Sequence, residues 1–196
     1  MRAKKRSTKA GLPPGSLVHV GMPSGQATKI TVFHYNDQHF EESSVDNVDA
    51  LQRQDLGNHM VNWVNMDGLE NVMMLEKIGV LYDMHPLTLE DILNTDHRPK
   101  AEDYGHYFYI VFKMLSYDDK SHRIDAEQVS VVLGRGYVLS FQEKEGDVFG
   151  PLRQSLRQGK GRVRKWEQTI WRTPCWMRWS IIIFAFWKES ASALSF

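Results

Sequence analysis

The stretch HYFYIVFKML, within residues 104–115, constrains the fold of this chain more than any other segment. Its residues are apolar at almost every position, so a strand made from it would present apolar side chains to both faces of a sheet. An edge strand or a half-exposed strand would alternate apolar and polar residues instead. The sequence therefore predicts a central strand in a sheet that is covered on both faces.

Other segments supply the rest of such a sheet and its cover. Two predicted strands, at 127–133 and 137–141, are joined by Gly134-Arg135-Gly136, which is typical of a hairpin. Pro86 suits a first helical position, and Gly79 suits the left-handed residue that ends a helix. Further strands are predicted at 17–20, 30–35, 39–45 and 60–66, and helices at 45–54, 69–78, 85–94 and 148–157. The predicted fold class is α/β, a three-layer α/β/α sandwich on a mixed β-sheet.

Composition excludes several classes of protein. Lys and Arg number 24 and Asp and Glu also number 24, so the chain lacks the basic excess of a nucleic-acid binder. One cysteine excludes a disulfide scaffold, and the apolar share of 42% argues against a multi-span membrane protein. The sequence has no phosphate-binding glycine loop, no GxSxG and no paired-histidine metal motif. We expect no enzyme, because no nucleophile–base pair is found.

The adjacent carboxylates Glu90 and Asp91 are the candidate site. In a helix that buries Leu89, Ile92 and Leu93, they point toward the other side. Most such pairs are solvated surface charge. They also suit Mg²⁺, which prefers oxygen ligands drawn from several segments or subunits and retains some water. On the pattern alone, the pair is compatible with a divalent-cation site.

Several segments, in order, resemble one family. The stretch HPLTLEDILNTDHRPKAEDYGHYFYIVFKML at 85–115 resembles the signature region of the cytosolic domain of the CorA family of magnesium transporters. The segments 10–21, 29–42, 127–153 and 161–165 continue the resemblance. The organisation predicted is a basic N-terminus at 1–9, a CorA-like cytosolic domain at 10–165 and an anomalous tail at 166–196.

The resemblance implies a function. In the family this domain forms the wall of a pentameric funnel, and Mg²⁺ between neighbouring copies is thought to hold the channel closed. Glu90 and Asp91 match the acidic pair of these intersubunit sites. We expect a regulatory Mg²⁺ site, weak in this chain because its partner carboxylates are missing. The chain also lacks the stalk, the two membrane helices and the Gly-Met-Asn pore motif. It would be soluble and cytoplasmic alone, and its parent would lie at the cytoplasmic face of the membrane.

The tail differs from the rest of the chain in composition. Five of the six tryptophans and the only cysteine, Cys175, lie in 166–196. We interpret the tail as an out-of-frame translation. If one lost base is restored after Lys165, each codon combines the last base of one tail residue with the first two bases of the next. Whatever codons are used, Trp166-Glu167 then encodes glycine and Trp176-Met177 encodes aspartate. With free wobble bases chosen, 166–184 decode to MGADYLAYALLDAMVDHYF, which resembles the family's next helix.

Two alternatives remain open from the sequence. The tail could be a genuine divergent segment, which the encoding DNA would show. The chain could also be a freestanding soluble scaffold that reuses the fold for protein contacts, which the absent pore favours.

Overall fold

A seven-stranded sheet forms the centre of the computed structural model, which describes residues 13, 17–20, 27–51, 60–118, 122–144, 149–159 and 164. The strand order is β2-β1-β3-β7-β6-β5-β4. The strands are β1 (Lys29–Tyr35), β2 (Phe40–Val45), β3 (Val61–Asp67), β4 (Lys100–Asp103), β5 (Tyr107–Asp118), β6 (Arg123–Gly134) and β7 (Tyr137–Gln142). The helices are η1 (Val48–Ala50), α1 (Val72–Leu81), α2 (Pro86–Leu93) and α3 (Gly150–Gln158).

The sheet is mixed, as predicted. β3 and β7 pair in parallel, whereas the other neighbouring strands pair antiparallel. β5 lies inside the sheet between β6 and β4, and Tyr107, Tyr109 and Val111 on one face and Phe108 and Ile110 on the other are all buried. Residues 107–111 of the apolar run therefore belong to an internal strand that is covered on both faces, one position from the edge, whereas Leu115 is 66% exposed.

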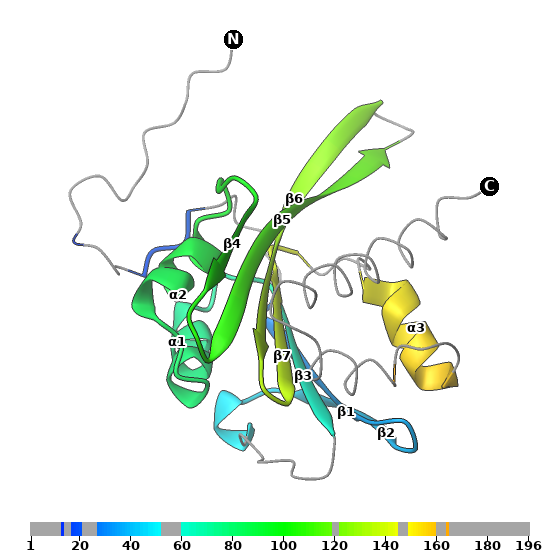
Figure 1. Ribbon diagram of the computed structural model, residues 1–196. Coiled ribbons are helices and arrows are strands. Elements are labelled where there is room, and N and C mark those ends of the chain that lie inside the picture. Colours follow the sequence, from blue (N-terminus) through cyan, green and yellow to red (C-terminus); the bar gives the residue numbers. More distant parts are fainter. Residues whose placement is uncertain are drawn as a thin grey trace.

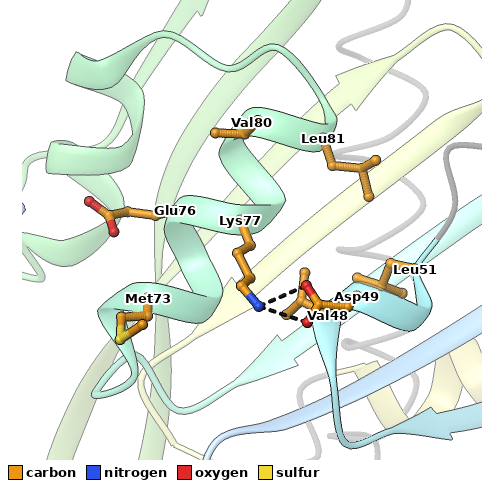
Figure 2. Close-up of a pocket in the computed structure, with 8 residues that line it drawn as sticks. All are labelled: Val48, Asp49, Leu51, Met73, Glu76, Lys77, Val80 and Leu81. Carbon is orange, nitrogen blue, oxygen red and sulfur yellow. Dashed lines mark hydrogen bonds and ion pairs between the residues drawn. The ribbon is translucent and has the colours of Figure 1, made fainter.

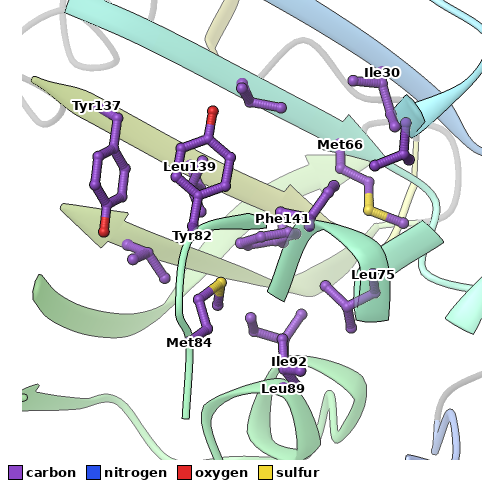
Figure 3. Close-up of a cluster of buried hydrophobic side chains, with 14 of the residues drawn as sticks. Ile30, Met66, Leu75, Tyr82, Met84, Leu89, Ile92, Tyr137, Leu139 and Phe141 are labelled. Atoms are coloured by element: carbon purple, nitrogen blue, oxygen red, sulfur yellow. The ribbon is translucent and has the colours of Figure 1, made fainter. Parts of the chain in front are cut away.

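Helices cover both faces of this sheet, which makes three layers (Figure 1). On one face, Leu75 and Ile78 of α1 and Ile92 of α2 pack over the sheet (Figure 3). The sheet residues beneath them include Ile30, Val64, Met66, Leu139 and Phe141. The α/β class and the three-layer architecture predicted from the sequence are confirmed.

The opposite face has a smaller aromatic core under α3. Trp63 stacks on Phe33 with ring centroids 4.5 Å apart, and it meets the edge of Phe149 at 5.5 Å. Leu152 and Leu156 of α3 close this cluster. Tertiary packing of this kind holds a nine-residue helix that would be marginal on its own.

Buried polar groups join the parallel pair β3 and β7. Trp63 Nε1 donates to Ser140 Oγ at 2.8 Å, and Ser140 Oγ donates to Asn65 Oδ1 at 2.7 Å. Gln142 Nε2 donates to Asp67 Oδ1 at 2.6 Å. All seven residues of β3 are buried, so the polar members of its alternating pattern lie inside the protein.

The start of α2 agrees with the sequence, whereas the end of α1 differs from it. α2 begins at Pro86, and Gly159 ends α3 with φ 62°, a left-handed conformation that glycine adopts freely. The prediction that Gly79 ends α1 is wrong, because the helix continues to Leu81. A Cβ on Gly79 would lie 2.6 Å from Leu89 Cδ1, so this glycine permits close packing of α1 against α2.

Some other predictions differ from the structure, and some concern residues that the structure does not describe. Residues 17–20 form no strand, and Val20 makes only an isolated parallel bridge with Asn94. The helix expected at 45–54 is reduced to the three residues of η1 within the described part of that segment, since 52–59 are not described. The edge strand β4 was not predicted. The N-terminus at 1–9 and the tail at 166–196 also lie outside the described residues.

Candidate functional site

The candidate carboxylates lie on α2, whose first turn is fixed to β5. The Tyr107 hydroxyl accepts from the backbone N–H of His85 at 3.0 Å and lies 2.8 Å from Thr88 Oγ1. The His85 ring accepts from the backbone N–H of Leu87 at 3.2 Å, which caps the helix. Tyr107 and Thr88 are buried, so the start of α2 has a fixed place on the sheet.

The other end of α2 is fixed to β6. Gln128 Nε2 donates to the backbone oxygens of Asp91 and Asn94, at 3.2 and 3.1 Å. Asp91 O also accepts from the backbone N–H of Asn94 at 3.2 Å, and Asn94 O accepts from that of His97 at 3.3 Å, so the buried Gln128 amide adds a second donor to each carbonyl. Lys113 Nζ donates to the backbone oxygen of Thr95 and to Gln128 Oε1, the latter at 3.4 Å. The backbone that carries Asp91 is therefore fixed at both ends of the helix.

Glu90 and Asp91 lie where the helical spacing predicts. Leu89, Ile92 and Leu93 are buried in the core, whereas Glu90 and Asp91 are half-buried at its border. The Asp91 side chain is only 16% exposed. It is therefore less accessible than a simple surface carboxylate would be.

Both carboxylate oxygens of Asp91 already contact nitrogen atoms of this chain. His97 Nε2 lies 2.7 Å from Oδ1, and Lys100 Nζ donates to Oδ2 at 2.6 Å. Lys100 is the first residue of β4, so an edge strand brings its ammonium group to α2. These contacts link the helix with the segment that follows it.

Lys100 has a second carboxylate partner in Glu102. Lys100 Nζ donates to Glu102 Oε1 at 2.9 Å, and the Tyr104 hydroxyl donates to Glu102 Oε2 at 3.2 Å. Burial lowers the pKa of Lys100, but its hydrogen bonds to Asp91 and Glu102 outweigh burial and the pKa is raised. The hydrogen bond from Lys100 lowers the pKa of Glu102 below its usual range. Lys100 therefore stays an ammonium ion shared between two carboxylates at neutral pH.

The donor chemistry of this surface suits a hard cation. Carboxylate oxygens are the ligands that Mg²⁺ prefers, and Glu90 and Asp91 on α2 and Glu102 on β4 each carry such oxygens. Within the described ranges, no three His, Cys, Asp or Glu side chains come together as a metal-binding set. Sequence reasoning missed His97, Lys100 and Glu102 because the short polar strand β4 has no apolar pattern.

A second concave surface lies between η1 and α1 and is mainly apolar. This groove has a volume of about 470 Å³ and is crossed by a pair in which Lys77 Nζ donates to Asp49 Oδ1 at 2.7 Å (Figure 2). Its other lining residues are Val48, Leu51, Met73, Glu76, Val80 and Leu81. Nothing in its lining resembles a set of cation ligands.

No helix in the described part of the chain is long and apolar enough to cross a membrane.

Two comparisons with known sequences indicate the same family. The model of the family described as CorA-like Mg²⁺ transporter protein matches residues 58–172. The chain is 40% identical over 166 residues to the cobalt/magnesium transport protein CorA of Thermotoga maritima. That alignment covers 84% of this chain and 46% of the relative, so the chain spans about half the relative's length.

Comparison with solved structures supports the fold. The full-length CmaX protein aligns with a TM-score of 0.56 and 15% identity, over 70% of this chain and 42% of CmaX. The cytoplasmic domain of ZntB from Vibrio parahaemolyticus aligns with a TM-score of 0.50 and 14% identity, over 67% of this chain and 51% of that domain. At these identities the matches show a shared fold.

Proposed function

The chain belongs to the family of CorA-like Mg²⁺ transporter proteins, and from this we propose that it is the cytosolic cation-sensing domain of a divalent-cation transport channel. The ion carried by the parent is Mg²⁺ or a similar divalent cation, in keeping with the name of its Thermotoga relative. The role is regulatory and not catalytic. The domain would lie at the cytoplasmic face of the membrane.

One observation supports this role most directly. α2 buries Leu89, Ile92 and Leu93 and is held at both ends by Tyr107 and Gln128, which leaves Glu90 and Asp91 at the border of the core. Their carboxylates have fixed positions because the helix has a fixed position. Fixed oxygen ligands are what a small cation with strict coordination geometry requires.

The proposed mechanism depends on a neighbouring copy of the chain. Without a cation, Glu90 and Asp91 of one copy and acidic side chains of its neighbour repel each other, which favours separation. Bound Mg²⁺ supplies the positive charge that cancels this repulsion. Glu90 and Asp91 then hold two copies together, and the population shifts toward the associated state. In an isolated copy of the chain the site should be weak, because the carboxylates of a neighbouring copy are then absent.

We also propose that 166–196 is an out-of-frame translation of the family's following helix. The uneven tryptophan distribution and the forced Gly and Asp codons support it. The family match ends at residue 172, within the first residues of this tail.

A Mg²⁺ titration by calorimetry tests the site. The chain should bind Mg²⁺ with millimolar affinity, and Glu90→Ala plus Asp91→Ala should abolish saturable binding. Asp49→Ala, which removes an exposed carboxylate beside Lys77, is the matched control and should leave binding unchanged. Submillimolar binding that survives the double substitution would refute the assignment.

A further inference from the structure

A cation that binds Asp91 has to compete with contacts that its carboxylate already makes. Lys100 Nζ occupies Oδ2 at 2.6 Å, and His97 Nε2 occupies Oδ1 at 2.7 Å. A directly bound Mg²⁺ would lie about 2.1 Å from a carboxylate oxygen. An ammonium group at 2.6 Å from the same atom shares its lone pairs and repels the incoming positive charge.

Lys100 has another partner to which it can turn. Glu102 Oε1 lies 2.9 Å from Nζ, and the Tyr109 ring lies below the ammonium at 5.6 Å from ring centroid to Nζ. Lys100 and Glu102 are two residues apart on β4, so their side chains leave the same face of the strand. If Asp91 were taken by another cation, Lys100 would keep a carboxylate and an aromatic face. The cost of releasing Asp91 is therefore smaller than the cost of leaving a charge unpaired.

We propose that Lys100 is an internal counter-ion that competes with the divalent cation for Asp91 and so sets the concentration at which the site fills. This inference rests on the proposed function, because it assumes that Asp91 is a ligand. With the cation absent, the Lys100 ammonium holds Asp91. With the cation bound, Lys100 pairs with Glu102 alone. Affinity is thus lowered by a group of the same chain, which keeps the site responsive at high cation concentration.

Replacement of Lys100 tests the competition. Lys100→Met keeps the length of the side chain and removes its charge, so the full chain should bind Mg²⁺ about tenfold more tightly in calorimetry. Lys100→Arg retains a cation and should bind no more tightly than the parent chain. The matched control is Lys77→Met, which removes another lysine paired with an aspartate, at 2.7 Å, but on α1. It should leave the Mg²⁺ affinity unchanged.

The outcomes separate this inference from the proposed function. Unchanged or weaker Mg²⁺ binding in Lys100→Met, together with loss of binding in Asp91→Asn, would overturn the competition but keep Asp91 as a ligand. Equal tightening by Lys77→Met would also overturn it, because the effect would then be one of net charge. Mg²⁺ binding that survives Asp91→Asn would refute the proposed site itself. Circular dichroism and thermal melting of each variant show whether the fold is retained. If Lys100→Met does not fold, Lys100→Gln gives the same test with a polar side chain.

Discussion

At the scale of single residues, Gly79 shows that a glycine can be required by packing between two helices, although the local sequence pattern predicts a helix end. It lies inside the last turn of α1, two residues before the helix ends, and a glycine within a helix costs up to about 1 kcal/mol relative to alanine. A Cβ added to Gly79 would lie 2.6 Å from Leu89 Cδ1 of α2, which is too close for a normal contact. The cost in helix propensity is therefore offset by a close approach of the helix that carries Asp91.

Substitution of Gly79 tests this packing. Gly79→Val should lower the free energy of unfolding by about 1–3 kcal/mol, because the added methyl groups overpack the contact with Leu89. Urea denaturation followed by circular dichroism measures the change. Val80→Ala, at a neighbouring side chain that is 84% exposed, should change stability by less than about 0.5 kcal/mol. Equal effects of the two substitutions would contradict the role given to Gly79.

The sequence predicts which carboxylates the candidate site contains, but not the contacts that they make. Glu90 and Asp91 follow from helical spacing, since Leu89, Ile92 and Leu93 define the buried side of α2. The pairing of Asp91 with Lys100 does not follow from spacing. It depends on where β4 joins the sheet, which the polar sequence of that strand does not reveal.

At the scale of elements, the sequence predicts some helix ends and one edge of the sheet, but not the other edge. Pro86 fixes the start of α2 through backbone conformation alone, so a local pattern predicts it. β4 and β2 carry many exposed polar residues and are held by pairing with β5 and β1. The sequence predicts β2 at 39–45, as a segment that pairs back on the strand before it, but nothing comparable marks β4.

One ion pair joins two elements that are far apart in sequence. Arg157 of α3 donates from Nε and Nη2 to the two carboxylate oxygens of Glu42 on β2, each at 2.7 Å. The hydrogen bond from Arg157 lowers the pKa of Glu42 below the usual 4.5 of a glutamate side chain. The folded state therefore binds a proton at Glu42 less readily than the unfolded state does.

This ion pair predicts a pH dependence. The stability it contributes is present above pH 4.5 and is lost as the pH falls through the lowered pKa of the folded state. Arg157→Gln should destabilise the protein by about 0.5–1 kcal/mol at pH 7, since both partners are partly exposed. The difference from the parent chain should be smaller at pH 3 than at pH 7, because it decreases as the pH falls through the lowered pKa of Glu42. Chemical denaturation at the two pH values measures it, and a difference independent of pH would contradict the assignment.

At the scale of the whole molecule, the chain is a recognisable domain followed by a tail of different composition. The family match covers 58–172, while the anomalous composition begins near Lys165. We expect the encoding DNA to contain, one base out of frame, codons for the family's next helix after Lys165. An intact frame into Trp166, with no family sequence in the other frames, would show that the tail is genuine.

The central claim is that Mg²⁺ acts through α2, and amide NMR of the labelled chain tests it most directly. We predict that Mg²⁺ produces saturable shifts at the amides of Glu90, Asp91 and Lys100, and that Asp91→Asn removes them. The expected midpoint is millimolar in the parent chain and about tenfold lower in Lys100→Met. Saturable shifts confined to other elements, or shifts at α2 that survive Asp91→Asn, would contradict the account.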